Sequence, residues 1–325
     1  MIQKYTKVFI VCPGNAVTGG PECLHALGAQ LIALGCDAYM SYQRADASES
    51  SNQTYSCPPP YKKYGVPHSP LVDGPDFAII FPEIYTKKAL TFKSSDVYIW
   101  WLSVDAYLTR YSPTFKDRFL SFFGRLPDNS APLDSLRSIK HLAQSHYAVD
   151  FLESHGLEAS YLSDYLSDEH LKARSVKSSR NDVILYNPAK GIQQTTQLIR
   201  TYRNYQFLPL IGMTSDQVHA AMLNAKLYID FGHHPGKDKM PREAAIAGCC
   251  IVTNLKGSAK FDDVNIPQQY KLDDSKSNFI PEFGQLAERV LSKFDSCTQD
   301  FEGYRQIIRK EPQAFYDDVK RNFFK

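Results

Sequence analysis

The chain has 325 residues, of which 43% are hydrophobic and 22% are charged, and its formal net charge is +2. A single hydrophobic core stops growing at about 250–300 residues, so this length favours two domains. The nearly balanced charge argues against a protein that binds nucleic acid over its whole surface.

The first half of the sequence begins with the pattern of a strand, a glycine-rich loop, a helix and a second strand. Residues 7–12, KVFIVC, form a β-branched apolar run, and residues 22–35 have apolar positions three and four apart, as in a helix. The next strand is expected at 37–42. This order is typical of a parallel, Rossmann-like sheet. Further strands are predicted at 77–82, 97–104 and 141–145.

A segment without apolar periodicity separates the second strand from the third. Residues 43–74 are rich in Ser, Pro and Gly, so we expect a long loop or a small excursion beside a site. A charged, Ser-rich linker near residue 175 then divides the chain. We predict an α/β protein of two Rossmann-like domains, 1–172 and 173–325, that face each other across a cleft.

The alternation of strands and helices restarts after this linker. Strands are predicted at 182–186, 207–212, 226–232 and 249–254, and helices at 192–204, 215–225 and 241–248. We expect Ser215 to be the N-cap of the second helix and Pro241 to occupy the first position of the third. The region from 283 to 325 is helical and amphipathic, and we expect it to return and brace the first domain.

The stretch FGHHPGKDKMPREAAIAGCC, residues 231–250, gathers two histidines, two lysines and an arginine between a strand and a helix. Ligands of open α/β sheets bind beyond the carboxyl ends of the strands. The unpaired N–H groups of a helix start favour a phosphate by about 0.3–1 kcal/mol. Arg242 is expected to add a charge-assisted contact, and the carboxylate of Glu243 suits a ribose diol. The alternative is a solvated turn in which Glu243 is only a favourable first-turn charge.

Two other loops carry candidate ligand contacts. Lys190 leaves the first strand of the second domain within YNPAKG, on the edge that also carries Arg242, so both are expected to converge on one diphosphate. Thr18, Gly19 and Gly20 precede the first helix within PGNAVTGGPE, which lacks both the G-x-G-x-x-G spacing and a following Lys-Ser/Thr. This loop is therefore neither a dinucleotide fingerprint nor a P-loop, and we expect it to line the cleft.

Taken together, these features resemble a GT-B glycosyltransferase of the bacterial surface-polysaccharide type, which makes capsule or O-antigen. The resemblance covers nearly the whole chain and is sharpest in TGGPECLHAL, WWLSVDAY, YNPAKG and GHHPGKDKMPREAAIAGCC. It implies that the second domain holds a nucleotide sugar, that Lys190 and Arg242 contact its diphosphate, and that Glu243 contacts its ribose. Many retaining members carry a second glutamate where this chain has Pro235, so retention or inversion stays open. The expected donor-site residues are Lys190, Gly232, His233, His234, Gly236, Lys237, Arg242 and Glu243.

The chemistry expected from this resemblance uses no metal ion and no other cofactor. The chain contains no Asp-x-Asp sequence. Lys190, Lys237 and Arg242 are expected to stabilise the departing diphosphate instead. His233 and His234 do not indicate a metal site, because sequence neighbours rarely share one ion and no third ligand lies close.

An inverting enzyme also needs a base for the acceptor hydroxyl, usually a carboxylate or a histidine. Asp105 is the first candidate, and His25 and Glu22 follow. Each has a structural alternative, such as a turn residue or a histidine on a buried helix face. Trp100 and Trp101 either stack on a sugar or belong to the core.

The partners expected are a nucleotide sugar and a glycan or lipid-linked acceptor, and no nucleic acid. The seven cysteines have no C-x-x-C spacing, which favours a reduced, cytoplasmic protein. The tail KRNFFK pairs basic with aromatic residues, so a peripheral contact at the inner face of the membrane stays open beside simple docking on the first domain. Alternative functions are a sugar-nucleotide epimerase of the same fold and a non-catalytic nucleotide-binding protein.

Overall fold

The computed structural model describes residues 2–43, 56–111, 130–172 and 180–325, and it divides the chain into two compact units. The first unit comprises Met1–Asp164 and Gln313–Lys325, and the second comprises Tyr165–Pro312. The domain boundary therefore differs from the expected 172/173. The linker near residue 175 and part of the predicted long loop, residues 44–55, lie outside the described residues.

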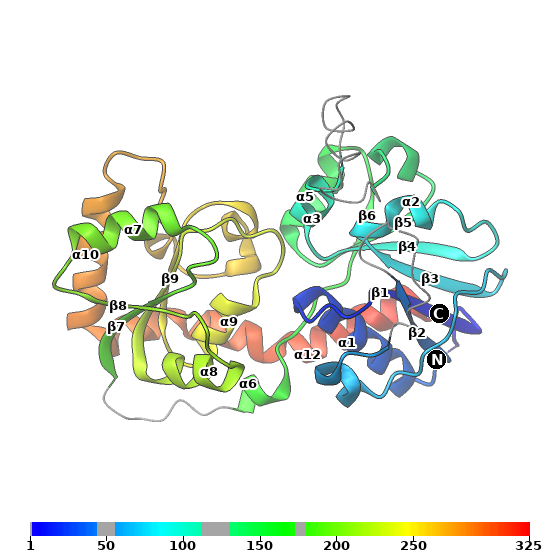
Figure 1. Cartoon of the computed structure of the whole chain (residues 1–325), viewed down its shortest axis with the longest axis horizontal. Coiled ribbons are helices and arrows are strands. Elements are labelled where there is room, and N and C mark those ends of the chain that lie inside the picture. Colours follow the sequence, from blue (N-terminus) through cyan, green and yellow to red (C-terminus); the bar gives the residue numbers. More distant parts are fainter. Residues whose placement is uncertain (1, 44–55, 112–129, 173–179) are drawn as a thin grey trace. The chain divides into compact units, whose positions relative to one another are not determined.

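The first unit contains a six-stranded parallel sheet in the order β2-β1-β3-β4-β5-β6 (Figure 1). Its strands are β1 (Lys7–Pro13), β2 (Ala38–Gln43), β3 (Phe77–Pro82), β4 (Asp96–Trp101), β5 (Lys140–Ala143) and β6 (Ala159–Tyr161). Trp100 and Trp101 are fully buried, and their indole N–H groups donate to Leu162 O and His141 Nδ1 at 2.9 and 3.1 Å. Both tryptophans belong to the core. The apolar runs predict the first five strands of this sheet, but not β6, which has only three residues.

Helices cover both faces of this sheet, with α1 on one face and α2, α3 and α5 on the other (Figure 1). Their bounds are α1 (Gly19–Ala33), α2 (Thr86–Ala89), α3 (Val104–Leu108) and α5 (His146–Ser154), with short 3₁₀ helices at Pro59–Tyr64, Glu83–Tyr85 and Leu133–Leu136. The strand predicted at 97–104 ends earlier, at Trp101. The reason is that Ser103 caps α3: its Oγ accepts from Ala106 N at 3.1 Å.

The second unit contains a four-stranded parallel sheet in the order β10-β9-β7-β8. Its strands are β7 (Asn181–Tyr186), β8 (Gln206–Pro209), β9 (Ala225–Asp230) and β10 (Cys250–Thr253). Its helices are α6 (Asp168–Lys172), α7 (Ile192–Thr201), α8 (Ser215–Asn224), α9 (Lys239–Ile246), α10 (Phe279–Ser292) and α11 (Phe294–Cys297), with 3₁₀ helices at Gly257–Lys260, Asp262–Val264, Gln268–Tyr270 and Thr298–Phe301. Helix α12 (Glu302–Phe323) begins in this unit, and its residues from Gln313 on belong to the first unit. Helices α7 and α10 pack on one face and α8 and α9 on the other (Figure 1).

Two helix starts differ from the prediction. Thr214, not Ser215, is the N-cap of α8, because its Oγ1 accepts from Gln217 N at 3.3 Å while the Gln217 Oε1 accepts from Thr214 N at 2.8 Å. Helix α9 begins at Lys239, so Pro241 is its third residue rather than its first. Proline is tolerated there because the first-turn N–H groups of a helix have no partner within the helix.

The carboxyl-terminal tail docks on the first unit. Lys325 N donates to Ile2 O at 2.9 Å, and Phe323 packs its ring against Tyr98 with 5.4 Å between the centroids. Phe323 and Phe324 are both buried. The aromatic residues of KRNFFK thus serve packing within this unit, which is one of the two roles expected for the tail. Among the described helices, none combines the length and the apolar character that crossing a membrane requires.

Candidate functional site

The loops that follow β7, β9 and β10 begin side by side at the carboxyl edge of the second sheet. In the register of these parallel strands, Tyr186 of β7 pairs with Ile229 of β9, and Thr253 of β10 pairs with Asp230. The residues that follow each strand therefore emerge together. This is the edge at which parallel α/β sheets hold their ligands.

Hydrogen bonds from the β10 loop fix the loop that follows β9, residues 231–238. Asn254 Nδ2 donates to Gly232 O at 2.9 Å. Ser258 N donates to His234 O at 2.9 Å, and Ser258 Oγ donates to Gly236 O at 2.6 Å. Three carbonyls of the predicted donor loop are thus held in place by neighbouring side chains and backbone.

Two glycines bring Lys190 against this loop. Gly191 precedes α7 with φ +63°, a left-handed conformation, and a Cβ there would overlap the carbonyl carbon of Phe231. A Cβ at Gly232 would lie 2.6 Å from Lys190 Cγ. Gly232 is one of the residues expected at the donor site. The space it leaves is filled by the stem of Lys190.

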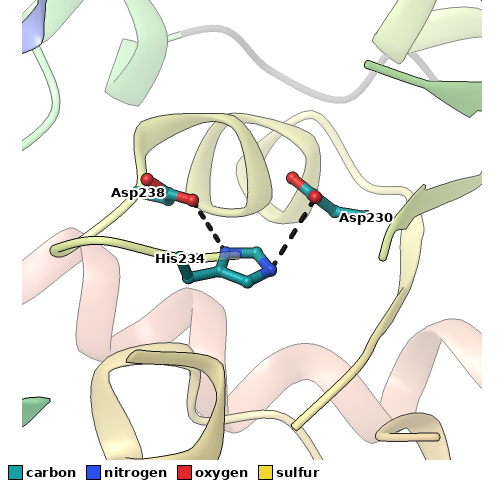
Figure 2. A group of neighbouring side chains, drawn as sticks. All are labelled: Asp230, His234 and Asp238. Atoms are coloured by element: carbon teal, nitrogen blue, oxygen red, sulfur yellow. Dashed lines mark ion pairs between the residues drawn. The ribbon is translucent and has the colours of Figure 1, made fainter. Parts of the chain in front are cut away.

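Lys190, Asp238, His234 and Asp230 form a closed charge ring. Figure 2 shows the imidazole of His234 between the two carboxylates, with Nδ1 2.7 Å from Asp238 Oδ2 and Nε2 3.8 Å from Asp230 Oδ1. Lys190 Nζ contacts the same carboxylates: it pairs with Asp238 Oδ2 and lies 3.3 Å from Asp230 Oδ2. His234 is 0% exposed, whereas the side chain of Lys190 keeps 24% of its surface.

The ring shifts the pKa values of Lys190 and Asp238 toward their charged forms. Burial lowers the pKa of Lys190, but the carboxylates of Asp230 and Asp238 outweigh burial and raise the pKa overall. Burial also raises the pKa of Asp238, and the contacts with His234 and Lys190 outweigh it, so the pKa ends below its usual value. Tyr228 OH and Gly232 N donate to Asp230 at 3.0 and 3.1 Å and orient that carboxylate.

The same residues raise the question of a metal ion, because Asp230, His234 and Asp238 each offer a ligand atom within 4.8 Å of the others. A single ion binds one nitrogen of an imidazole, but here the two nitrogens face different carboxylates (Figure 2). The ammonium of Lys190 also lies against both carboxylates. The expectation that no third ligand lies close to His234 is therefore wrong, and in this structure the possible ligand atoms are engaged in the charge ring.

Arg242 and Lys237 are placed differently from the expectation. Arg242 is 0% exposed, and its guanidinium donates to Lys237 O at 2.9 Å, to Asp238 O at 3.2 Å and to Glu311 Oε2 at 2.9 Å. Lys237 Nζ lies 2.9 Å from Glu311 Oε1. A buried guanidinium needs a carboxylate partner, and Glu311 of α12 supplies it. Arg242 thus ties the loop to α12 rather than facing a ligand.

Glu243 lies on α9 next to two histidines that the sequence did not single out. Its Oε1 is 3.6 Å from His170 Nε2, and the His170 ring is 5.9 Å from that of His219. Burial and the neighbouring His170 lower the pKa of His219. The ribose contact of Glu243 stays a prediction. His233 is exposed on the loop.

In the first unit, the glycine loop and Asp105 follow β1 and β4 at the carboxyl edge of the sheet. Thr18 is the N-cap of α1, and Gly19 and Gly20 are its first residues. Asp105 is half-buried in the first turn of α3. Asp105 follows its strand as the sequence predicts, whereas Gly19 and Gly20 belong to α1 and not to a loop before it. The roles of these residues stay predictions.

His25, the second candidate base, is engaged at both ring nitrogens. Nδ1 lies 2.6 Å from Pro21 O and Nε2 lies 2.9 Å from Tyr42 OH. Because a carbonyl only accepts, Nδ1 carries the proton and Nε2 accepts from Tyr42. Burial lowers the pKa of His25. This geometry fits the structural alternative. Glu22 accepts from Tyr64 OH at 3.1 Å.

Glu83 is a buried carboxyl group that sequence reasoning missed. It follows β3 at the same edge as Asp105, and its Oε2 accepts from Leu102 N at 3.0 Å. Burial raises its pKa to about 7. The only sequence signal is an acidic residue directly after the apolar run FAIIFP.

A cavity of about 770 Å³ lies elsewhere in the first unit, at the amino ends of β4, β5 and β6. Its arginines and lysines include Arg137, Lys140 and Arg321. Each of these three pairs with a neighbouring aspartate, at 2.7, 2.5 and 3.0 Å. The cavity lies at the opposite end of the strands from the glycine loop and Asp105.

Solved structures are similar to this chain over nearly their whole length. Anabaena HepE in complex with UDP has a TM-score of 0.65 at 12% identity, covering 98% of this chain and 99% of that one. Sucrose-phosphate synthase from Thermosynechococcus elongatus has 0.63 at 11%, covering 98% of both chains. WaaG, a glycosyltransferase involved in lipopolysaccharide biosynthesis, has 0.58 at 12%, covering 96% and 99%. The chain has the GT-B fold of these structures. No protein-family model matches the sequence, and neither does any curated protein.

Proposed function

We propose that this protein is a glycosyltransferase that moves a sugar from a nucleotide-activated donor to a glycan or lipid-linked acceptor in surface-polysaccharide synthesis. The observation that carries the proposal is the charged ammonium of Lys190, held at the carboxyl edge of the second sheet of a GT-B fold. Structures of Anabaena HepE with UDP and with UDP-glucose support a nucleotide sugar as the donor. The likeness to WaaG, which is involved in lipopolysaccharide biosynthesis, supports the class of product.

In this proposal, Lys190 binds the donor diphosphate and stabilises the negative charge that builds up on it as the glycosidic bond to the phosphate breaks. Lys190 provides a built-in cation, so the reaction is proposed to need no metal ion. Glu243 binds the ribose, and the loop carrying His233 and Gly236 lines the donor site. If the reaction inverts the anomeric centre, Asp105 takes the proton of the acceptor hydroxyl.

Thermal unfolding with nucleoside diphosphates, with and without chelator, tests this function. A ligand at a hundredfold its dissociation constant stabilises by about 2.7 kcal/mol, which raises the Tm by a few degrees. We expect UDP to raise the Tm equally in both conditions, and Lys190→Met to reduce the shift at the same UDP concentration. The absence of a shift with every nucleoside diphosphate would contradict the proposal.

Lys226 offers a matched control for Lys190. Its side chain is 18% exposed and pairs with Asp182 at 2.5 Å, but it lies at the start of β9, at the opposite end of the strand from the donor loop. Lys226→Met should leave the UDP shift intact. Transfer assays with and without acceptor then separate a transferase from an epimerase, which converts the donor alone.

A further inference from the structure

His234 occupies a position that the backbone fixes. Its carbonyl accepts from Ser258 N at 2.9 Å. Gly257 has φ +56°, and a Cβ there would overlap that same carbonyl oxygen. The β10 loop therefore presses directly on the backbone of His234. This contact fixes the backbone of His234, and the fixed backbone places the imidazole between Asp230 and Asp238 (Figure 2).

Asp238 is at the N-cap position of α9, but its carboxylate does not cap the helix. An aspartate at this position usually accepts a hydrogen bond from an N–H of the first helical turn. Among the described residues, its carboxylate caps no such N–H, and it points instead to His234 Nδ1 and Lys190 Nζ. The carboxylate therefore contacts the charge ring and lacks the stabilising cap contact.

A lysine side chain is long and flexible, so an ammonium that must meet a phosphate gains from being held in place beforehand. An ammonium has three N–H donors. Two carboxylates, those of Asp230 and Asp238, face Lys190 Nζ, and the side chain remains partly exposed. This geometry leaves a donor for a phosphate oxygen while the carboxylates keep the ammonium oriented.

We propose that His234 is a positioning residue of the donor site, which holds the carboxylate of Asp238 against Lys190 and so aims the ammonium at the diphosphate of the nucleotide sugar. The proposal rests on the function proposed above. His234 acts here without touching the donor through its ring, because the ring is fully buried. The 2.7 Å contact between Nδ1 and Asp238 Oδ2 also draws negative charge of Asp238 away from Lys190, so that the carboxylate competes less with the phosphate.

Two substitutions of His234 separate this role from simple packing. The amide nitrogen of an asparagine lies close to the place of Nδ1, and that of a glutamine lies close to the place of Nε2. Since the short contact to Asp238 involves Nδ1, we expect His234→Asn to keep UDP affinity within about threefold. We expect His234→Gln to lose about tenfold or more, because it removes the close contact that holds Asp238 against Lys190. Equal losses in both variants would overturn the positioning role.

A buried histidine in the first unit controls for destabilisation alone. His141 is buried, and both of its ring nitrogens contact other groups, at 3.1 and 3.2 Å. His141→Asn should lower the Tm and leave UDP affinity, measured by calorimetry at a temperature where all variants are folded, unchanged.

A double-mutant cycle tests whether His234 acts through Lys190. In a Lys190→Met background, His234→Gln should change UDP affinity by less than about twofold, because the group that it positions is gone. Losses that multiply in the double variant would overturn the proposal. A metal site would give two different results. The UDP affinity of His234→Gln would rise on adding Mn²⁺ or Zn²⁺, or the UDP affinity of the wild type would fall with chelator. Either result would overturn the proposal.

A second cycle without any ligand distinguishes failure of the inference from failure of the function. His234→Gln and Asp238→Asn should be non-additive in the free energy of unfolding, since they remove the same contact. If the two substitutions are coupled but the wild type binds no UDP, then the ring only stabilises the fold, and both proposals are refuted. UDP binding without coupling would refute the role of His234 alone.

Discussion

Glu311 of α12 and Arg242 of α9 form a buried ion pair, with Arg242 Nη1 2.9 Å from Glu311 Oε2 and with side-chain exposures of 0% and 4%. The two residues are 69 positions apart in the sequence. The pair joins the start of α9 to α12, and the loop 231–238 directly precedes α9. Both residues belong to the second unit, which ends at Pro312. Glu311 therefore pairs with two cations of this region, Lys237 and Arg242.

Removal of this carboxylate should destabilise the protein strongly. Glu311→Ala leaves the guanidinium of Arg242 buried without its acid, and breaking a buried pair on one side costs about 3–5 kcal/mol. Urea unfolding measures this loss. Glu302→Ala is the control on the same helix, because the Glu302–Arg309 pair is exposed, and it should cost less than about 1 kcal/mol. Similar losses in the two variants would show that Glu311 does not carry the buried charge.

Gly232→Ala should disturb the donor site through Lys190. The new Cβ would lie 2.6–2.7 Å from Cβ, Cγ and Cδ of Lys190, atoms near the backbone that have little freedom to move. Overpacking of this kind costs about 1–3 kcal/mol, and the displaced ammonium should lower UDP affinity by about tenfold. Gly303→Ala is the matched control: a Cβ there meets nothing within 4 Å among the described residues, and alanine favours the helix. Unchanged UDP affinity in Gly232→Ala would contradict the placement of Lys190.

Much of the fold follows from the sequence because buried parallel strands read as apolar runs. KVFIVC, FAIIFP and CCIVTN all become strands within one or two residues of the predicted bounds. Caps were less predictable. Serine is intrinsically the better N-cap of the adjacent Thr214 and Ser215, but the reciprocal hydrogen bonds with Gln217 select Thr214.

The sequence indicates at which edge of the sheet the candidate residues lie, but not which groups they contact. YNPAKG places Lys190 at the correct edge, since the carboxyl end of β7 fixes where that loop emerges. The charge of Arg242 is visible in the sequence, but Glu311 is too distant along the chain for local spacing to reveal the pair. The sequence does carry a signal for the partners of His234. Asp230 and Asp238 lie four residues before and after it, whereas His233, its neighbour in sequence, is not part of the ring.

Glu83 should make stability fall as the pH rises from acid to neutral. Burial raises its folded-state pKa to about 7, above the ordinary value of 4.5, so the folded state binds the proton more tightly than the unfolded state does. The stabilisation is fully present below pH 4.5 and is lost by about pH 7, with a magnitude on the order of 3 kcal/mol.

Urea unfolding at pH 5.5 and pH 8 isolates this contribution by comparison with Glu83→Gln. Every other titrating group changes equally in both proteins, so the variant should lose less stability between the two pH values. Identical pH dependence in the two proteins would show that Glu83 titrates at its ordinary value.

Asp105→Asn tests the acceptor side of the proposed reaction. Asp105 lies in the first turn of α3, whose N-cap Ser103 holds the loop after β4, so the substitution should change the chemistry and not the fold. Loss of a general base lowers kcat by about 10²–10⁴-fold, while UDP affinity, set in the other unit, should stay the same. Asp134→Asn, at an exposed carboxylate of the same unit, is the control and should keep full turnover. Full turnover in Asp105→Asn would move the base to another group, of which Glu22 is the next candidate, or indicate a reaction that retains the anomeric configuration.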